Sequence, residues 1–169
     1  MGWWGITARE SDTGLDYLYI AIEKCLIPVD FKHFDVKSIM QTLETHIINR
    51  VRKEIEPDVN DKEEIQEYIE SRLSDEYYIV PLLVADCLKE YYQKGKITLH
   101  YAGTDRKVTE IICTDSVLDE LLEGLQEALD PKCYPNYSWA NDKIRKKWIA
   151  HVKDMCDSLK SLKRVNGNG

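Results

Sequence analysis

Residues 77–95 read YYIVPLLVADCLKEYYQKG, and this stretch decides the fold that the sequence predicts. Its apolar side chains between positions 79 and 88 cover nearly the whole circumference of a helix, which is typical of a helix surrounded by other helices. Pro81 suits a first helical turn, where a missing N–H is harmless, and Gly95 suits the C-cap. The stretch therefore predicts the central helix of a bundle.

Apolar residues recur every three or four positions on both sides of this stretch, which predicts amphipathic helices around the central one. The expected helices run from Asp12 to a stop at Pro28, over residues 35–56, through a short acidic stretch after Asp61, over 115–129 and over 139–162. At 169 residues the chain is expected to form one domain, helical over residues 1–164 and followed by a disordered tail over 165–169. The predicted fold is mainly α, a helical bundle of five to six helices.

The one β pattern lies at about residues 96–113. Ile97, Leu99 and Tyr101 alternate with polar residues, positions 102–106 contain turn-forming residues, and positions 108–113 are β-branched and apolar. This pattern predicts one small β-hairpin that packs on the helices, because an isolated hairpin is only marginally stable.

Charge is unevenly distributed along the chain. The formal net charge is −7, which argues against a general nucleic-acid binder because phosphate attraction needs a basic surface. Residues 54–76 hold ten acidic residues against Lys62 and Arg72, whereas residues 143–164 hold eight basic residues against two acidic ones. We expect the basic run to be a solvated helix face opposite the acidic side chains of the preceding helix, among them Asp119.

Several absences shape the remaining expectations. The N-terminus shows no signal-peptide pattern, and no apolar run reaches the roughly 18–20 residues that a membrane span needs. The five cysteines are odd in number and contain no CxxC pair, so reduced cysteines in the cytoplasm are expected rather than disulfides or zinc.

No nucleotide, metal or nucleophile motif is found, so neither a cofactor nor catalytic residues are predicted. The sequence predicts no oligomeric state.

The opening Met-Gly-Trp-Trp-Gly resembles a family of uncharacterised bacterial proteins, domain of unknown function 4259, whose members begin Met-Gly-Xaa-Trp-Gly. The positions that fit the family pattern without a gap are Gly2, Trp4, Gly5, Glu10, Asp12, Leu15, Asp16 and Leu18. The chain departs from the pattern at Arg9, Gly14 and Tyr17. The resemblance implies a small helical fold and supplies neither an activity nor catalytic residues.

This opening also supplies the first candidate site. Trp3 and Trp4, beside Asp12 and Asp16, would suit a cationic or planar ligand held between aromatic faces and carboxylates. The preferred interpretation is structural: an indole closes one end of the bundle and Asp12 caps the first helix.

Asp86 is the second candidate, because it is a carboxylate within the apolar run of the central helix. A buried carboxylate must find a partner or shift its pKa, and such groups cluster at functional sites. We expect instead that Asp86 lies on a solvent-facing strip of that helix, beside Lys89 or Glu90. If it is buried, its expected partner is Arg9, Arg50 or His46.

Two functions remain open from the sequence alone. The preferred one is a non-enzymatic, immunity-like accessory protein of bacteria whose acidic surface, centred on residues 54–76, meets a basic protein partner. The alternative is a small enzyme or ligand-binding protein that uses the Trp3, Trp4, Asp12 and Asp16 end. A cavity with converging polar groups would favour the alternative.

Overall fold

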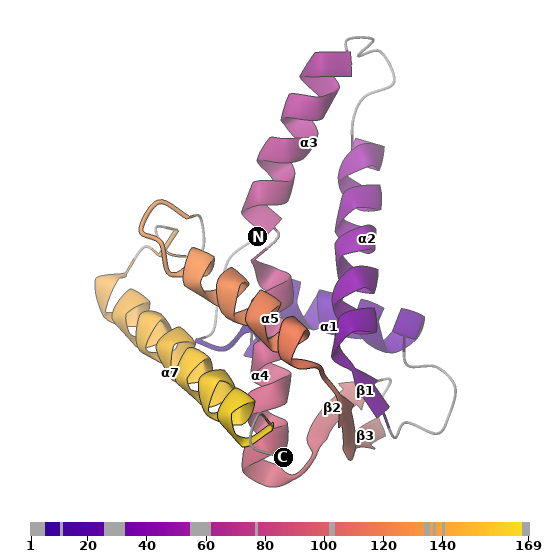
Figure 1. Ribbon diagram of the computed structural model, residues 1–169. Helices are drawn as coiled ribbons and strands as arrows, with labels where there is room; N and C mark the ends of the chain where they lie inside the picture. The colour runs from indigo at the N-terminus through magenta and orange to yellow at the C-terminus, as the bar shows by residue number, and fades with distance from the viewer. Residues whose placement is uncertain are drawn as a thin grey trace.

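The structure is a computed structural model that describes residues 6–10, 12–25, 33–54, 62–76, 78–101, 104–133, 136, 138–139 and 141–166. The predicted mainly α fold is confirmed, with six α-helices and small two-stranded sheets over these residues (Figure 1). The helices are α1 (Asp12–Cys25), α2 (Val36–Glu54), α3 (Lys62–Glu76), α4 (Ile79–Lys94), α5 (Asp115–Ala128) and α7 (Asp142–Asn166), and a 3-10 turn, η1 (Ala8–Glu10), precedes α1. None of the described helices is both long and apolar enough to cross a membrane.

Helix α4 forms the centre of the bundle, as predicted. Every residue from Ile79 to Leu88 is buried, and α1, α2, α5 and α7 all pack against this helix. Figure 1 shows α5 and α7 on one side of α4 and α1 and α2 on the other. Gly95 ends the helix with φ 67°, and its N–H donates to the carbonyl of Tyr91 at 2.6 Å. Few residues other than glycine adopt this left-handed conformation readily, which explains the C-cap.

Pro81 also sets how closely α5 approaches α4. A Cβ added at Gly124 of α5 would lie 2.9 Å from both Cβ and Cγ of Pro81. Real carbon atoms do not pack this closely, so α5 needs a residue without a side chain at this crossing. Gly124 therefore positions α5 against the first turn of the central helix.

Side-chain caps fix the starts of two helices. Asp35 caps α2, since its Oδ1 accepts from the backbone N–H of Ser38 at 3.2 Å and its Oδ2 from the Ser38 hydroxyl at 3.0 Å. Asn141 caps α7 by accepting from the N–H groups of Lys143 and Ile144 at 2.9 and 3.2 Å. Helix α7 starts three residues later than expected and extends to Asn166, into the segment predicted to be a tail.

The predicted hairpin is present, but it is shorter than expected. Strand β2 (Ile97–Tyr101) pairs antiparallel with β3 (Thr104–Val108), in a register that sets Ile97 opposite Val108. The expected second strand was residues 108–113. Instead, β4 (Glu110–Ile112) pairs in parallel with β1 (His33–Asp35), a strand that the sequence did not predict.

Helices α2 and α3 form what we call the α2–α3 arm. Figure 1 shows them side by side and antiparallel, with α3 and the outer end of α2 standing away from the other helices. The inner part of α2 buries Ile39, Leu43 and Ile47 in the core. Among the α3 side chains that the structure describes, Ile65 alone is partly buried. The described contacts therefore anchor the arm through α2.

Candidate functional site

Asp86 is buried on α4, with 7% of its surface exposed. Its Oδ2 accepts a hydrogen bond from the backbone N–H of Ala8 at 2.7 Å, and its Oδ1 lies 2.7 Å from Nε2 of His151 on α7. The prediction of a solvent-facing strip is therefore wrong. The α4 face that carries Asp86 is covered by η1 and α7, which supply two hydrogen-bonding groups to its carboxylate.

Of the expected partners of a buried Asp86, Arg9 interacts with it through charge, whereas its hydrogen bonds come from Ala8 and His151. His46 packs edge-on against the ring of Tyr17, with ring centroids 6.2 Å apart, and the Arg50 guanidinium lies 5.9 Å from the centre of that same ring. One signal in the sequence pointed to His151. It lies three residues after Trp148 and four before Met155, which places it beside the buried stripe of α7.

The contact with Asp86 fixes how His151 can act. A neutral imidazole donates its Nε2–H to the carboxylate, which leaves the lone pair of Nδ1 available as an acceptor. No hydrogen bond to Nδ1 is present within the described part of the chain. With 15% of its side chain exposed, His151 is an oriented imidazole at the surface of a cleft.

A second polar cluster lies next to this pair. Arg9 of η1 forms an ion pair with Glu90, one turn beyond Asp86 on α4, and donates from Nη2 to the carbonyl oxygen of Thr98 at 2.6 Å. Nζ of Lys94 lies 3.4 Å from the other oxygen of Glu90. Burial alone would raise the pKa of Glu90, but the hydrogen bond and charge of Arg9, with the charge of Lys94, outweigh burial and lower it.

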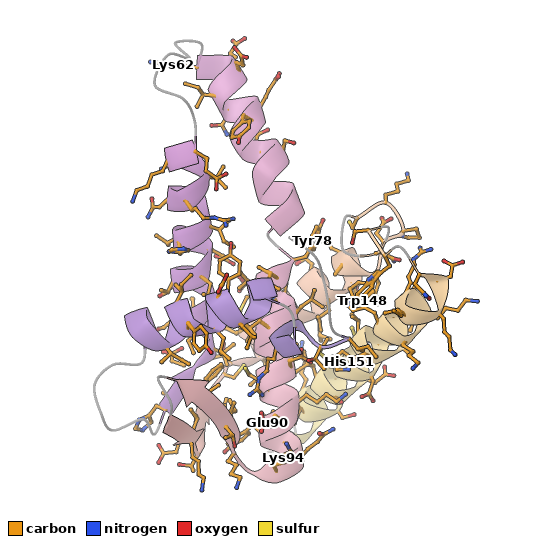
Figure 2. All side chains as sticks on the ribbon, turned by 180° about the vertical axis from the view of Figure 1, so that it is seen from behind. Lys62, Tyr78, Glu90, Lys94, Trp148 and His151 are labelled. Atoms are coloured by element: carbon orange, nitrogen blue, oxygen red, sulfur yellow. The ribbon has the colours of Figure 1, made fainter. Side chains whose placement is uncertain are left out.

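These groups line an open cleft of about 570 Å³, which we call the Asp86 cleft. One wall is largely apolar and comes from α1, with the side chains of Leu15, Leu18 and Tyr19. The ionisable groups of the lining come from η1, α4 and α7, namely Arg9, Asp86, Lys89, Glu90, Lys94 and His151. Figure 2 shows Glu90 and Lys94 toward one end of α4, and His151 near them. The cleft therefore combines an apolar surface with converging polar groups, as ligand sites usually do.

Cys87 adjoins Asp86 in sequence but plays no reactive part. Its side chain is fully buried, and burial raises the pKa of its thiol to about 12. A thiol with this pKa stays protonated at neutral pH and is a poor nucleophile. No group of three or more metal-ligating side chains occurs among the residues that the structure describes.

A second hollow, of about 620 Å³, is larger but less like a site. The described residues that line it all belong to α2, from Ser38 to Lys53, and none of them is a buried ionisable group. Volume alone does not mark a ligand site, whereas converging buried polar groups do. The Asp86 cleft is therefore the candidate site.

Of the N-terminal candidate residues, the structure describes the side chain of Asp16. Trp3 and Trp4 lie outside the described residues, as does the side chain of Asp12, so the capping role of Asp12 stays a prediction. Asp12 is the first residue of α1. Asp16 is exposed on α1. Its neighbour Leu15 lines the Asp86 cleft.

No family model, curated protein or solved structure matches this chain. The resemblance of the Met-Gly-Trp-Trp-Gly opening to a family of uncharacterised bacterial proteins therefore stays a prediction.

Two ion pairs join α7 to neighbouring helices, and one of them is a contact between the basic run and α5 that the sequence predicted. Lys163 forms an ion pair with Asp119 of α5, and Asp154 of α7 itself pairs with Lys89 of α4. Three of the four side chains in these pairs are well exposed, and Lys89 is the exception, so the pairs contribute little to stability.

Proposed function

We propose that this protein binds a small organic ligand in the Asp86 cleft. The observation that carries the proposal is the Asp86 carboxylate, buried on the central helix and bonded to His151 at the cleft wall. A ligand-binding protein is the alternative that the sequence left open, and the proposed site is the Asp86 cleft instead of the Trp3 and Trp4 end.

The energetic cost of burying the Asp86 carboxylate supports this proposal. Burying an ionised carboxylate is costly, and replacing a buried ion pair by apolar residues is often neutral or stabilising. An all-apolar α4 would therefore serve the core at least as well as one that carries Asp86. The pair instead holds an imidazole in one orientation beside an open cleft, and oriented groups of this kind lower the cost of binding a ligand.

The test is a titration followed by NMR on the histidine ring nitrogens. The probes are three benzene derivatives of similar size, namely benzoate, benzamide and benzylamine. We expect at least one of them to shift the ring signals of His151, because its ring lines the cleft. The signals of His33, which is exposed on β1, should stay unchanged. If none of the three shifts His151, the protein does not bind aryl ligands in this cleft and the proposal is wrong.

A second function is favoured by the α2–α3 arm. Its acidic side chains Glu63, Glu64, Glu67 and Glu70 are all exposed on α3, and Figure 2 shows Lys62 at the tip of the arm, far from His151. The acidic excess belongs to α3, because the last turn of α2 carries the exposed residues Arg52 and Lys53. A projecting surface with an excess of one charge sign attracts and selects partners of the opposite sign. We therefore retain the proposal of an immunity-like accessory protein with a basic protein partner.

The arm proposal is tested by capturing a basic protein from a host lysate at low and high salt. A variant in which the four glutamates are changed to Gln should lose the captured protein, and high salt should weaken its capture. The His151→Gln variant should retain it, because the cleft is remote from the arm. Capture that survives the four changes would rule out the arm as the docking surface.

We also propose that the protein works in the cytoplasm. The cysteines whose side chains the structure describes are all free thiols, namely Cys87, Cys113, Cys133 and Cys156. Free thiols persist in a reducing compartment, whereas oxidising compartments favour disulfides.

A further inference from the structure

We infer that the ligand of the Asp86 cleft is an organic anion with an apolar body, such as an aryl carboxylate. This inference rests on the proposed function and adds the chemical class of the ligand. In this arrangement the apolar body lies on the α1 wall of the cleft, and the anionic group meets the cationic side chains that line it.

Both acidic side chains in the cleft already have donor partners in the protein, and this favours an anionic ligand over a cationic one. Asp86 is bonded to Ala8 and His151, and Glu90 is bonded to Arg9 and Lys94. Both carboxylates are therefore already engaged by donors of the protein. A cationic ligand would have to displace these partners before it could meet a negative group, and losing a buried partner is costly.

Among the described residues, the charges at the cleft balance. Arg9, Lys89 and Lys94 stand against the two carboxylates and Asp154, which pairs with Lys89, and His151 adds a positive charge when it is protonated. This balance occurs in a chain whose formal net charge is −7. Since the rest of the molecule is acidic, an anion meets less repulsion in the cleft than elsewhere on the protein.

Lys94 is the side chain best placed to bind the anionic group. Its side chain is 60% exposed, and its Nζ is 3.4 Å from Glu90, the long end of hydrogen-bonding distance. Lys89 is less available, because it is mostly buried and paired with Asp154. Lys94 can therefore turn toward a ligand without losing a strong contact.

The apolar wall requires that the ligand be more than a bare ion. Leu18 is buried, Leu15 is half-buried and Tyr19 is 36% exposed along the α1 side of the cleft. An inorganic anion would leave this wall in contact with water and gain nothing from it. A ring or short aliphatic chain would bury part of this wall, which is favourable in proportion to the apolar area covered.

The same three probes, with inorganic phosphate added, test this inference through their dissociation constants, measured from the His151 shifts. We expect benzoate to bind about tenfold more tightly than benzamide, and benzylamine and phosphate to bind more weakly still. Lys94→Gln should weaken benzoate about fivefold or more and leave benzamide unchanged. The matched control is Lys153→Gln, at an exposed lysine on α7, which should leave benzoate binding unchanged.

The outcomes separate the inference from the proposed function. If benzamide or benzylamine binds as tightly as benzoate, the cleft binds ligands but does not select anions, and only the inference is wrong. If phosphate matches benzoate, the apolar body is irrelevant and the inference is also wrong. If no probe shifts His151, the inference and the proposed function both fail.

Discussion

The carboxylate of Asp86 joins three segments that are far apart in the chain. Ala8 precedes it by 78 residues and His151 follows it by 65, and both bond to the same side chain. Sequence alone identified Asp86 as an anomaly in an apolar helix but did not predict its partners. Helical periodicity gives the face on which a residue lies, and it does not tell which of several neighbouring helices covers that face.

Removing this carboxylate should destabilise the fold strongly. Asp86→Ala leaves the N–H of Ala8 and the ring of His151 without their acceptor, so we expect a loss of about 3 kcal/mol in the free energy of unfolding. The matched control is Asp119→Ala, which breaks the exposed pair with Lys163 and should cost less than about 1 kcal/mol. Both losses are measured by denaturant unfolding at neutral pH. Equal losses in the two variants would contradict the structural role of Asp86.

The ion pair between Arg9 and Glu90 should make the free energy of unfolding depend on pH. Its pKa is lowered in the folded protein from an ordinary value of 4.5. A carboxylate whose pKa is lower in the folded than in the unfolded protein stabilises the fold while it is ionised. This contribution is fully present above pH 4.5 and is lost as the pH falls through the lower, folded-state pKa. Glu90→Gln should therefore be less stable than the wild type at pH 7, and the difference should shrink at about pH 3. A difference that stays constant between these pH values would show that the Arg9–Glu90 pair does not stabilise the fold.

At the scale of elements, the long helices were predictable and one sheet was not. The core run of α4 and the glycine that ends it are local signals, since each depends on residues within a few turns. Strand β1 has only three residues and pairs with β4, with His33 opposite Glu110. A strand of this length shows no usable alternation, and its partner lies far along the chain. Only the tertiary structure reveals that pairing.

The all-round burial of α4 predicts a large cost for shortening one of its side chains. Leu83 is 2% exposed, and Leu83→Ala should lower the free energy of unfolding by about 2–5 kcal/mol, because the change removes apolar contacts and leaves a cavity. Ile144 of α7 serves as the control: its place in the apolar pattern suggested burial, but it is 40% exposed. Ile144→Ala should cost less than about 1 kcal/mol. Denaturant melts that rank the two variants in the reverse order would contradict the packing described here.

At the scale of the whole molecule, stability and charge are unevenly distributed. The body packs five helices around a continuous apolar core, whereas α3 has α2 as its main packing partner. The exposed glutamates of α3 and the cationic side chains of the Asp86 cleft lie in different parts of the protein. The two proposed functions therefore use separate surfaces.

This unevenness predicts the pattern of amide hydrogen exchange. Local opening requires least free energy where few apolar contacts are lost, so the amides of α3 should exchange much faster than those of α4, by about a hundredfold or more after correction for intrinsic rates. The inner part of α2 supplies an internal reference, because Ile39, Leu43 and Ile47 are buried in the core and their amides should exchange slowly. Native-state exchange followed by NMR resolves these segments in one experiment. If α3 were as protected as α4, the arm would be held by contacts beyond α2, and its exposed glutamates would be a poor choice of docking surface.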